Sequence, residues 1–185
     1  MKTLFKNILV LAVMLGTCTS YANATLEVSP TFNNVNEGDL ISVSDASGEV
    51  IYNGRINYAG NLEKLYDFSQ LNNGIYTVEV NKDFEIIVNS VEVKNNVVTF
   101  IENSNSKIFK PVFRTIDSKV IISKLAIDTD EMEVELYFEN ELIHTEVAKG
   151  KETINRVYQL DKSLRGDYTA IIRSNGRVFV KSFKL

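Results

Sequence analysis

The chain has 185 residues, 44% of them hydrophobic, with 20 basic and 24 acidic side chains, one histidine, one cysteine and no tryptophan. Its net charge of −4 argues against nucleic acid as a partner, since phosphate binding needs a concentrated basic face. Because the single cysteine is Cys18, the chain can form neither an internal disulfide nor a multi-thiolate metal site.

The first 24 residues have the pattern of a secretory signal peptide. Lys2 and Lys6 give a positive start, residues 8–15 form a short apolar run, and Ala22-Asn23-Ala24 provides the small residues of a cleavage site. The apolar run is shorter than the roughly 20 residues that span a bilayer, and no later run is longer, so we expect no transmembrane segment. We predict cleavage after Ala24 and a secreted protein, located in the periplasm, at the cell surface or outside the cell.

An alternative uses Cys18 as a lipid anchor. Leu15-Gly16-Thr17-Cys18 resembles a bacterial lipobox, in which the cysteine is lipidated and becomes the new N-terminus. Thr17 stands where Gly, Ala or Ser is expected, so the sequence favours a signal peptide that is discarded with Cys18.

After the signal segment the apolar residues recur every second position, which indicates half-buried strands. Strand patterns occur in chain order at residues 76–80, 120–125, 132–138 and 177–183. Turn-forming clusters lie between them, and no amphipathic helix is evident. Short strands separated by turns predict an all-β fold, a sandwich or barrel. The turn clusters are Asp45-Ala46-Ser47-Gly48, Asn72-Asn73-Gly74, Asp128-Thr129-Asp130-Glu131 and Ser174-Asn175-Gly176.

The second half of the chain resembles the first at a spacing of 92 residues. Residues 74–77 align with 166–169, and Val88-Asn89-Ser90 aligns with Val180-Lys181-Ser182. Tyr66-Asp67-Phe68 likewise aligns with Tyr158-Gln159-Leu160. Self-similarity at a fixed spacing indicates duplicated units. We therefore predict two tandem domains, residues 25–102 and 103–185, after the signal peptide of residues 1–24.

Each half carries a glycine two residues before a tyrosine, Gly74 with Tyr76 and Gly166 with Tyr168. In immunoglobulin-like sandwiches a tyrosine near the start of strand F folds back onto a nearby backbone group and forms a tyrosine corner. The glycine would allow a tight turn. The pattern predicts immunoglobulin-like antiparallel sandwiches with these four residues in structural roles.

The run from Leu40 to Val93 resembles small exported β-sandwich domains of Bacteroidota, on the residues Gly48-Glu49-Val50-Ile51-Tyr52 and Leu71–Val78. This group includes the C-terminal sorting domains of the type IX secretion system and related immunoglobulin-like domains. The resemblance implies a β-sandwich fold and bacterial export. A sorting role is implied less directly, because the Asn-Pro pair that often opens such tails is absent.

The polar residues 103–107 read as a short linker between the halves. Residues 108–113 are apolar but contain Pro111, whose missing amide predicts an edge strand or a docking arm. Val97–Ile101 could close the first domain or open the second.

His144 is the only histidine, and it lies on a predicted strand without a nucleophile motif, so we interpret it as an exposed strand residue rather than a general base. Asp128, Asp130 and Glu131 could hold calcium, but the spacing lacks the glycine and distant glutamate of a calcium loop. We therefore interpret them as a solvated turn. We predict no cofactor, no metal site and no enzymatic activity.

Two further patterns also have structural interpretations. Arg165-Gly166-Asp167 spells an integrin-binding tripeptide but overlies residues 73–75 of the other repeat, where the glycine already has a structural task. Tyr52, Tyr58 and Tyr137 could stack on sugar rings, but aromatic residues that cover cross-strand neighbours are the simpler interpretation.

Charge is unevenly shared: residues 25–102 carry 4 basic and 12 acidic side chains, and residues 103–185 carry 14 and 12. Such asymmetry could steer a partner toward one domain. The sequence favours a non-catalytic exported protein that works in binding, adhesion or assembly, and the alternative is a type IX sorting or export module.

Overall fold

The computed structural model describes residues 35–60 and 71–185. The expected signal segment 1–24, with Ala24 and Cys18, lies outside these residues, as does the repeat anchor at 66–68. The described chain is all-β with antiparallel sheets, as β-sandwich domains are, which confirms the predicted fold class. None of its described parts forms a helix long and apolar enough to cross a membrane.

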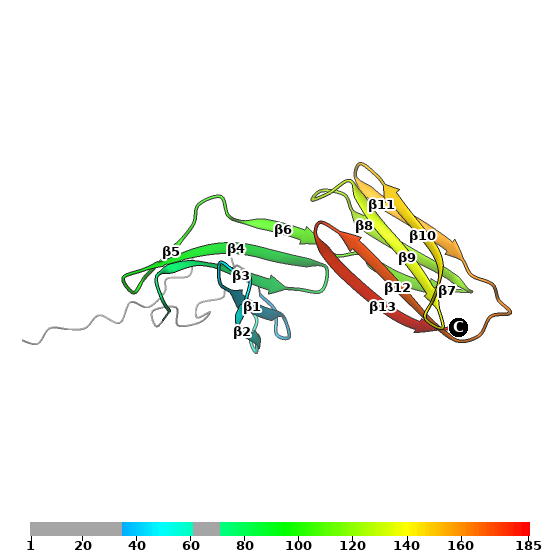
Figure 1. Cartoon of the computed structure of the whole chain (residues 1–185), viewed down its shortest axis with the longest axis horizontal. Coiled ribbons are helices and arrows are strands. Elements are labelled where there is room, and N and C mark those ends of the chain that lie inside the picture. The colour runs from blue at the N-terminus through cyan, green and yellow to red at the C-terminus, as the bar shows by residue number, and fades with distance from the viewer. Residues whose placement is uncertain (1–34, 61–70) are drawn as a thin grey trace, which may run out of the picture.

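The first unit, described residues 35–109, contains one sheet in the order β2-β1-β3-β4-β5, and β6 pairs with another part of β4 (Figure 1). One face of this sheet is apolar, because every second residue of β3 is buried, as the period of two predicts. Its buried cluster includes Val43, Val78 and Val91. The strands are β1 Leu40–Ser44, β2 Val50–Arg55, β3 Gly74–Asn81, β4 Glu85–Lys94, β5 Val97–Phe100 and β6 Ser106–Phe109.

The second unit, residues 112–185, is a sandwich of a four-stranded sheet, β10-β9-β12-β13, and a three-stranded sheet, β11-β8-β7 (Figure 1). Its core draws on both sheets, with Ile122 and Ile154 from one and Leu136, Tyr168 and Ile172 from the other. The strands are β7 Val112–Ile116, β8 Lys119–Leu125, β9 Glu131–Phe138, β10 Glu141–Lys149, β11 Thr153–Gln159, β12 Asp167–Ser174 and β13 Arg177–Lys184.

The two four-strand series β2-β1-β3-β4 and β10-β9-β12-β13 have the same order, and three of the four strand pairs follow the predicted spacing. β2, β3 and β4 correspond to β10, β12 and β13 at 92 residues. β1 corresponds to β9 only at a spacing of 93 residues, which aligns its buried residues Ile41 and Val43 with the buried Val134 and Leu136 of β9. A one-residue slip reverses every facing of a strand, so the repeat contains a one-residue gap after β1. The positions 92 residues before β8 and β11 fall at 27–33 and 61–67, outside the described residues.

The predicted edge strand or docking arm is two short edge strands separated by Lys110-Pro111. β6 pairs with β4 of the first unit, and β7 is the outer strand of the three-stranded sheet. β5 also pairs with β4, so Val97–Phe100 belongs to the first unit. By strand pairing, the change from one unit to the next falls after Phe109.

Candidate functional site

Tyr76 and Tyr168 both have the geometry of a tyrosine corner. The Tyr76 hydroxyl donates to the Asn72 carbonyl at 2.9 Å, and the Tyr168 hydroxyl donates to the Leu164 carbonyl at 3.0 Å. Burial raises the pKa of Tyr168, so the hydroxyl keeps the proton it donates. Each bond joins the tyrosine to a backbone carbonyl four residues earlier, just before β3 and β12.

The expected reason for the glycines needs correction. Neither Gly74 nor Gly166 has a positive φ, so neither turn requires the conformational freedom of glycine. A Cβ on Gly166 would collide with Glu139 Oε1 and lie 2.9 Å from the Phe138 ring, so glycine is needed there because other side chains approach closely. Glu139 Oε1 also accepts the Asp167 amide at 2.8 Å, which ties the Arg165-Gly166-Asp167 run to the neighbouring turn.

His144 lies in a cluster of titratable side chains between β10 and β11, which we call the Glu146 cluster: His144, Glu146, Arg156 and Tyr158. Glu146 accepts Arg156 Nε at 2.6 Å and the Tyr158 hydroxyl at 2.9 Å, and His144 Nε2 lies 3.9 Å from it. The hydrogen bond from Arg156 lowers the pKa of Glu146. Burial and the bond to Glu146 raise the pKa of Tyr158. The Glu146 carboxylate on β10 thus accepts hydrogen bonds from two residues of β11, which connects the edge strands of the two sheets.

Glu146→Gln is expected to destabilise the fold by about 1 kcal/mol at pH 7, the upper range of a partly exposed ion pair. Because the folded pKa lies below the ordinary value of 4.5, this stabilisation is present above that value and is lost as pH falls through the folded pKa. Urea unfolding at several pH values measures the difference between the parent and the variant. This difference in the free energy of unfolding should become smaller below pH 4.5.

Glu141→Gln is the matched control on β10, since Glu141 is exposed and forms no ion pair in the described part of the chain. A parent–variant difference at position 146 that stayed constant down to pH 3 would contradict this account of the cluster.

Asp128 is not part of a solvated turn, and the expectation is wrong at this residue. Its side chain is 4% exposed and pairs with the fully buried ammonium of Lys124. Its Oδ2 accepts the Phe109 amide at 3.1 Å and Asn175 Nδ2 at 3.2 Å. Burial alone would raise the pKa of Asp128, but these hydrogen bonds outweigh it and lower the pKa. No group of three potential metal ligands occurs in residues 35–60 and 71–185.

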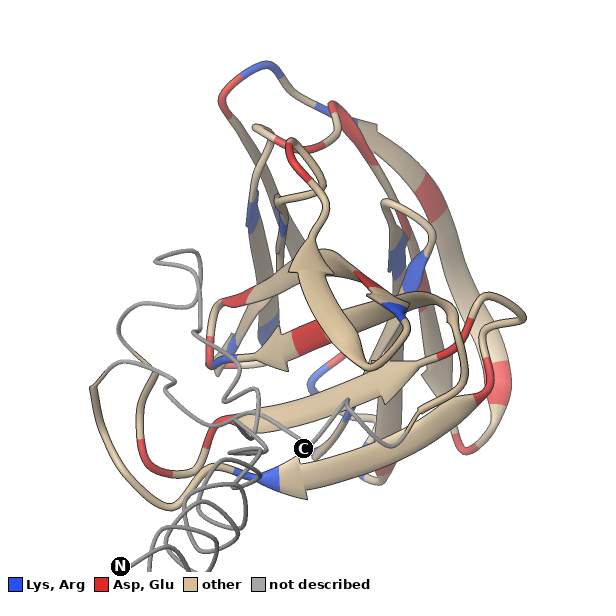
Figure 2. Cartoon of the chain, turned by 90° about the vertical axis from the view of Figure 1, so that its left-hand side faces the viewer, with Lys and Arg blue, Asp and Glu red and all other residues tan. Residues whose placement is uncertain are grey.

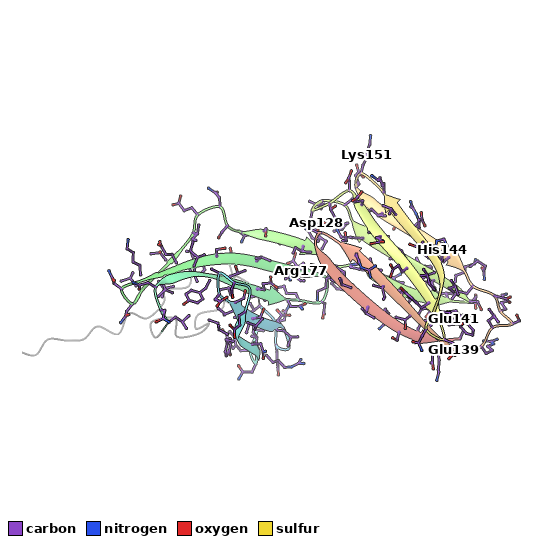
Figure 3. All side chains as sticks on the ribbon, viewed as in Figure 1. Asp128, Glu139, Glu141, His144, Lys151 and Arg177 are labelled. Atoms are coloured by element: carbon purple, nitrogen blue, oxygen red, sulfur yellow. The ribbon has the colours of Figure 1, made fainter. Side chains whose placement is uncertain are left out.

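The bonds of Asp128 bring the two units together. Phe109 ends β6 on the first unit, whereas Lys124 and Asn175 belong to the second. Asp128 and Arg177 lie at the end of the second unit that faces the first, and Glu139 and Glu141 lie at the other end (Figure 3). Arg177 also forms an ion pair with Glu79 on β3.

A cavity of about 580 Å³ lies at this junction. Phe84, Phe109, Val112 and Leu125 supply most of its apolar wall. Lys110 lines it too and donates to the Lys82 carbonyl, and burial lowers the pKa of Lys110. The volume suits a small ligand, but the amines of Lys110 and Lys124 already have partners within the chain. The cavity is best described as the seam between the units.

Reversing one charge of the Arg177–Glu79 pair should loosen the seam while leaving each unit folded. Arg177→Glu is expected to widen the distribution of inter-unit orientations and to cost at most about 1 kcal/mol of stability. The double change Arg177→Glu with Glu79→Arg should restore the parent orientation. Residual dipolar couplings measured in both units report the distribution of inter-unit orientations. If that distribution were as wide in the double variant as in the single variant, the Arg177–Glu79 pair would not orient the units.

The outer face of the four-stranded sheet carries ion pairs in its centre and apolar residues at its edges. Arg173 Nη1 lies 2.9 Å from Glu135, and the Tyr137 hydroxyl donates to the same carboxylate at 3.0 Å. Arg173 is the largest cause of the lowered pKa of Glu135. Val147 on β10 and Val178 on β13 share this face and are 57% and 59% exposed. Basic and acidic positions are interspersed on the strands seen in Figure 2.

The tyrosines considered for sugar stacking do not form a group. Tyr52 packs against the first core, Tyr137 is bonded to Glu135, and Tyr58 is partly exposed. The residues that sequence reasoning missed are those of the seam, because Lys124, Asp128 and Asn175 meet only in the folded chain.

Residues 22–94 are similar to a protein family described as the secretion system C-terminal sorting domain. The match ends where β4 ends, and it indicates a secreted or exported protein. No curated protein matches the chain. Extracellular domains 3–5 of Drosophila OTK align over 80% of this chain and 86% of theirs, at 8% identity and a TM-score of 0.25, which is too low to bear on fold or function.

Proposed function

We propose that this chain is a non-catalytic exported protein of a Bacteroidota bacterium that binds a partner through the outer surfaces of two tandem sandwich domains. The supporting observation is the exposure of Val147, Val178 and Val180 at the edges of the outer sheet face, between 57% and 61%. Contiguous exposed apolar residues are typical of interaction surfaces, and Val178 and Val180 are neighbouring outward positions of β13. Export is supported by the similarity of residues 22–94 to a sorting domain.

The triple variant Val147→Glu, Val178→Glu, Val180→Glu tests binding through this face. Parent and variant are exported from the native host and cross-linked on intact cells, and their adducts are compared. We expect one dominant adduct with the parent and its loss in the variant. An unchanged adduct, or none with the parent, would overturn the proposal. Matching melting curves of the purified proteins ensure that both are folded.

The second candidate function is a type IX sorting or export module, favoured by the match of residues 22–94. It predicts that delivery beyond the outer membrane requires the type IX machinery. Fractionation of cells with and without that machinery separates the candidates. If delivery were unchanged without that machinery, the sorting role would be ruled out and only the binding role would remain.

A further inference from the structure

β13 forms one edge of the four-stranded sheet. Its only strand partner in the described residues is β12, so the backbone groups on its other side face outward. An exposed edge of this kind is a template for an added strand. The corresponding strand of the first unit, β4, is in a different situation.

β6 covers the edge of β4 that corresponds to the outer edge of β13. Ile108 of β6 stands opposite Ile86, and both are buried, with Ile86 6% exposed. The residue 92 positions after Ile86 is Val178, which is 59% exposed. Val88, opposite Ser106 of β6, likewise corresponds to Val180, which is 61% exposed. Of these two positions, the first is therefore buried and the second half-buried where a strand is added, and both are exposed where it is not.

The charge of β13 indicates what charge an added strand should carry. β13 carries three cations, Arg177, Lys181 and Lys184, and no acidic residue. Arg177 pairs with Glu79, and Lys184 pairs with Asp167 at the surface. Lys181 has no ion-pair partner among residues 35–60 and 71–185. A second copy of β13 would bring like charges together across the strands, which is unfavourable.

We propose that the outer edge of β13 binds an extended acidic segment of a partner protein as an added antiparallel strand. An apolar side chain of that strand covers Val178, as Ile108 covers Ile86, and an acidic side chain lies opposite Lys181. This inference rests on the proposed binding function and specifies its site and the chemistry of the partner.

The probe is a capped synthetic peptide of residues 102–110 with Asn105→Glu and Lys107→Glu. In the β4–β6 pairing Val88 stands opposite Ser106, so the next pair along the strands is Asn89 with Asn105. Asn89 corresponds to Lys181 at the spacing of 92 residues, so position 105 of the peptide should stand opposite Lys181. Titration into isotope-labelled protein should shift amide signals of β13 and slow the exchange of its outward-pointing amides. The unaltered peptide, which keeps Lys107, should bind about tenfold more weakly or worse, since it presents a cation to a cationic strand.

Val180→Glu should weaken peptide binding by about tenfold or more, because it places an anion beside the acidic strand. Val157→Glu is the matched control, since Val157 is 60% exposed on β11 of the other sheet, outside the face that carries Val147, Val178 and Val180. Signal shifts confined to β10, equal losses in both variants, or equal binding of the unaltered peptide would each overturn the proposal. A dimer abolished by Val180→Glu would overturn it in favour of self-association.

Cross-linking with the single variants separates this inference from the proposed function. An adduct that survives Val180→Glu but not Val147→Glu leaves the binding function standing and removes β13 as its site. The absence of any adduct with the parent overturns the function itself. Loss with Val180→Glu alone supports both.

Discussion

Asp128→Ala is expected to lower the free energy of unfolding by about 3–5 kcal/mol, the range for removing one partner of a buried ion pair. The variant leaves the Lys124 ammonium, which is fully buried, without its counter-ion. It also leaves the Phe109 amide and Asn175 Nδ2 without their acceptor. The seam should loosen as well, because the Phe109 amide belongs to the other unit.

Urea unfolding followed by circular dichroism measures the loss, and amide exchange in the two units shows which of them opens. Asp130→Ala is the matched control two residues away, where the side chain is exposed, and it should stay within about 0.5 kcal/mol of the parent. Asp128→Asn separates charge from hydrogen bonding, since the amide keeps an oxygen acceptor but not the charge. A stability of Asp128→Ala within 1 kcal/mol of the parent would show that Lys124 finds another partner.

The contrast between Tyr168 and Asp128 shows what the sequence can predict. The bond of Tyr168 runs to Leu164, four residues earlier, so its residues lie within one local motif. The bonds of Asp128 run to Phe109, Lys124 and Asn175, and the last of these is 47 residues away. No periodicity brings such residues together, and an acidic turn in sequence is normally solvated.

Strand pairing has the same division between local and distant information. The period of two within β3 and β9 predicted which residues are buried, because alternation is a property of the strand alone. The addition of β6 to β4 was open in the sequence, since an apolar segment next to Pro111 fits several edges. The shift of β1 was hidden too, because the residues compared in the repeat, from Tyr66 onward, all lie after the gap.

Replacing Tyr168 should produce the other large effect. Tyr168 is 2% exposed, and its ring lies 4.8 Å from the Phe138 ring and 5.4 Å from the Phe183 ring, centroid to centroid. Tyr168→Ala removes this ring from the core and is expected to cost about 3–5 kcal/mol, as large aromatic deletions do. Thermal and urea unfolding of the parent and the variant measure it.

Tyr168→Phe keeps the ring and removes only the hydroxyl, so it isolates the corner bond. It leaves the Leu164 carbonyl without that donor and should cost about 1 kcal/mol or more. Tyr76→Phe makes the same change in the first unit, where the hydroxyl bonds to Asn72, and should have a similar effect. If Tyr168→Phe melted with the parent while Tyr168→Ala lost several kcal/mol, Tyr168 would stabilise the sandwich by packing alone, and the glycine–tyrosine pattern would mark a core aromatic residue rather than a corner.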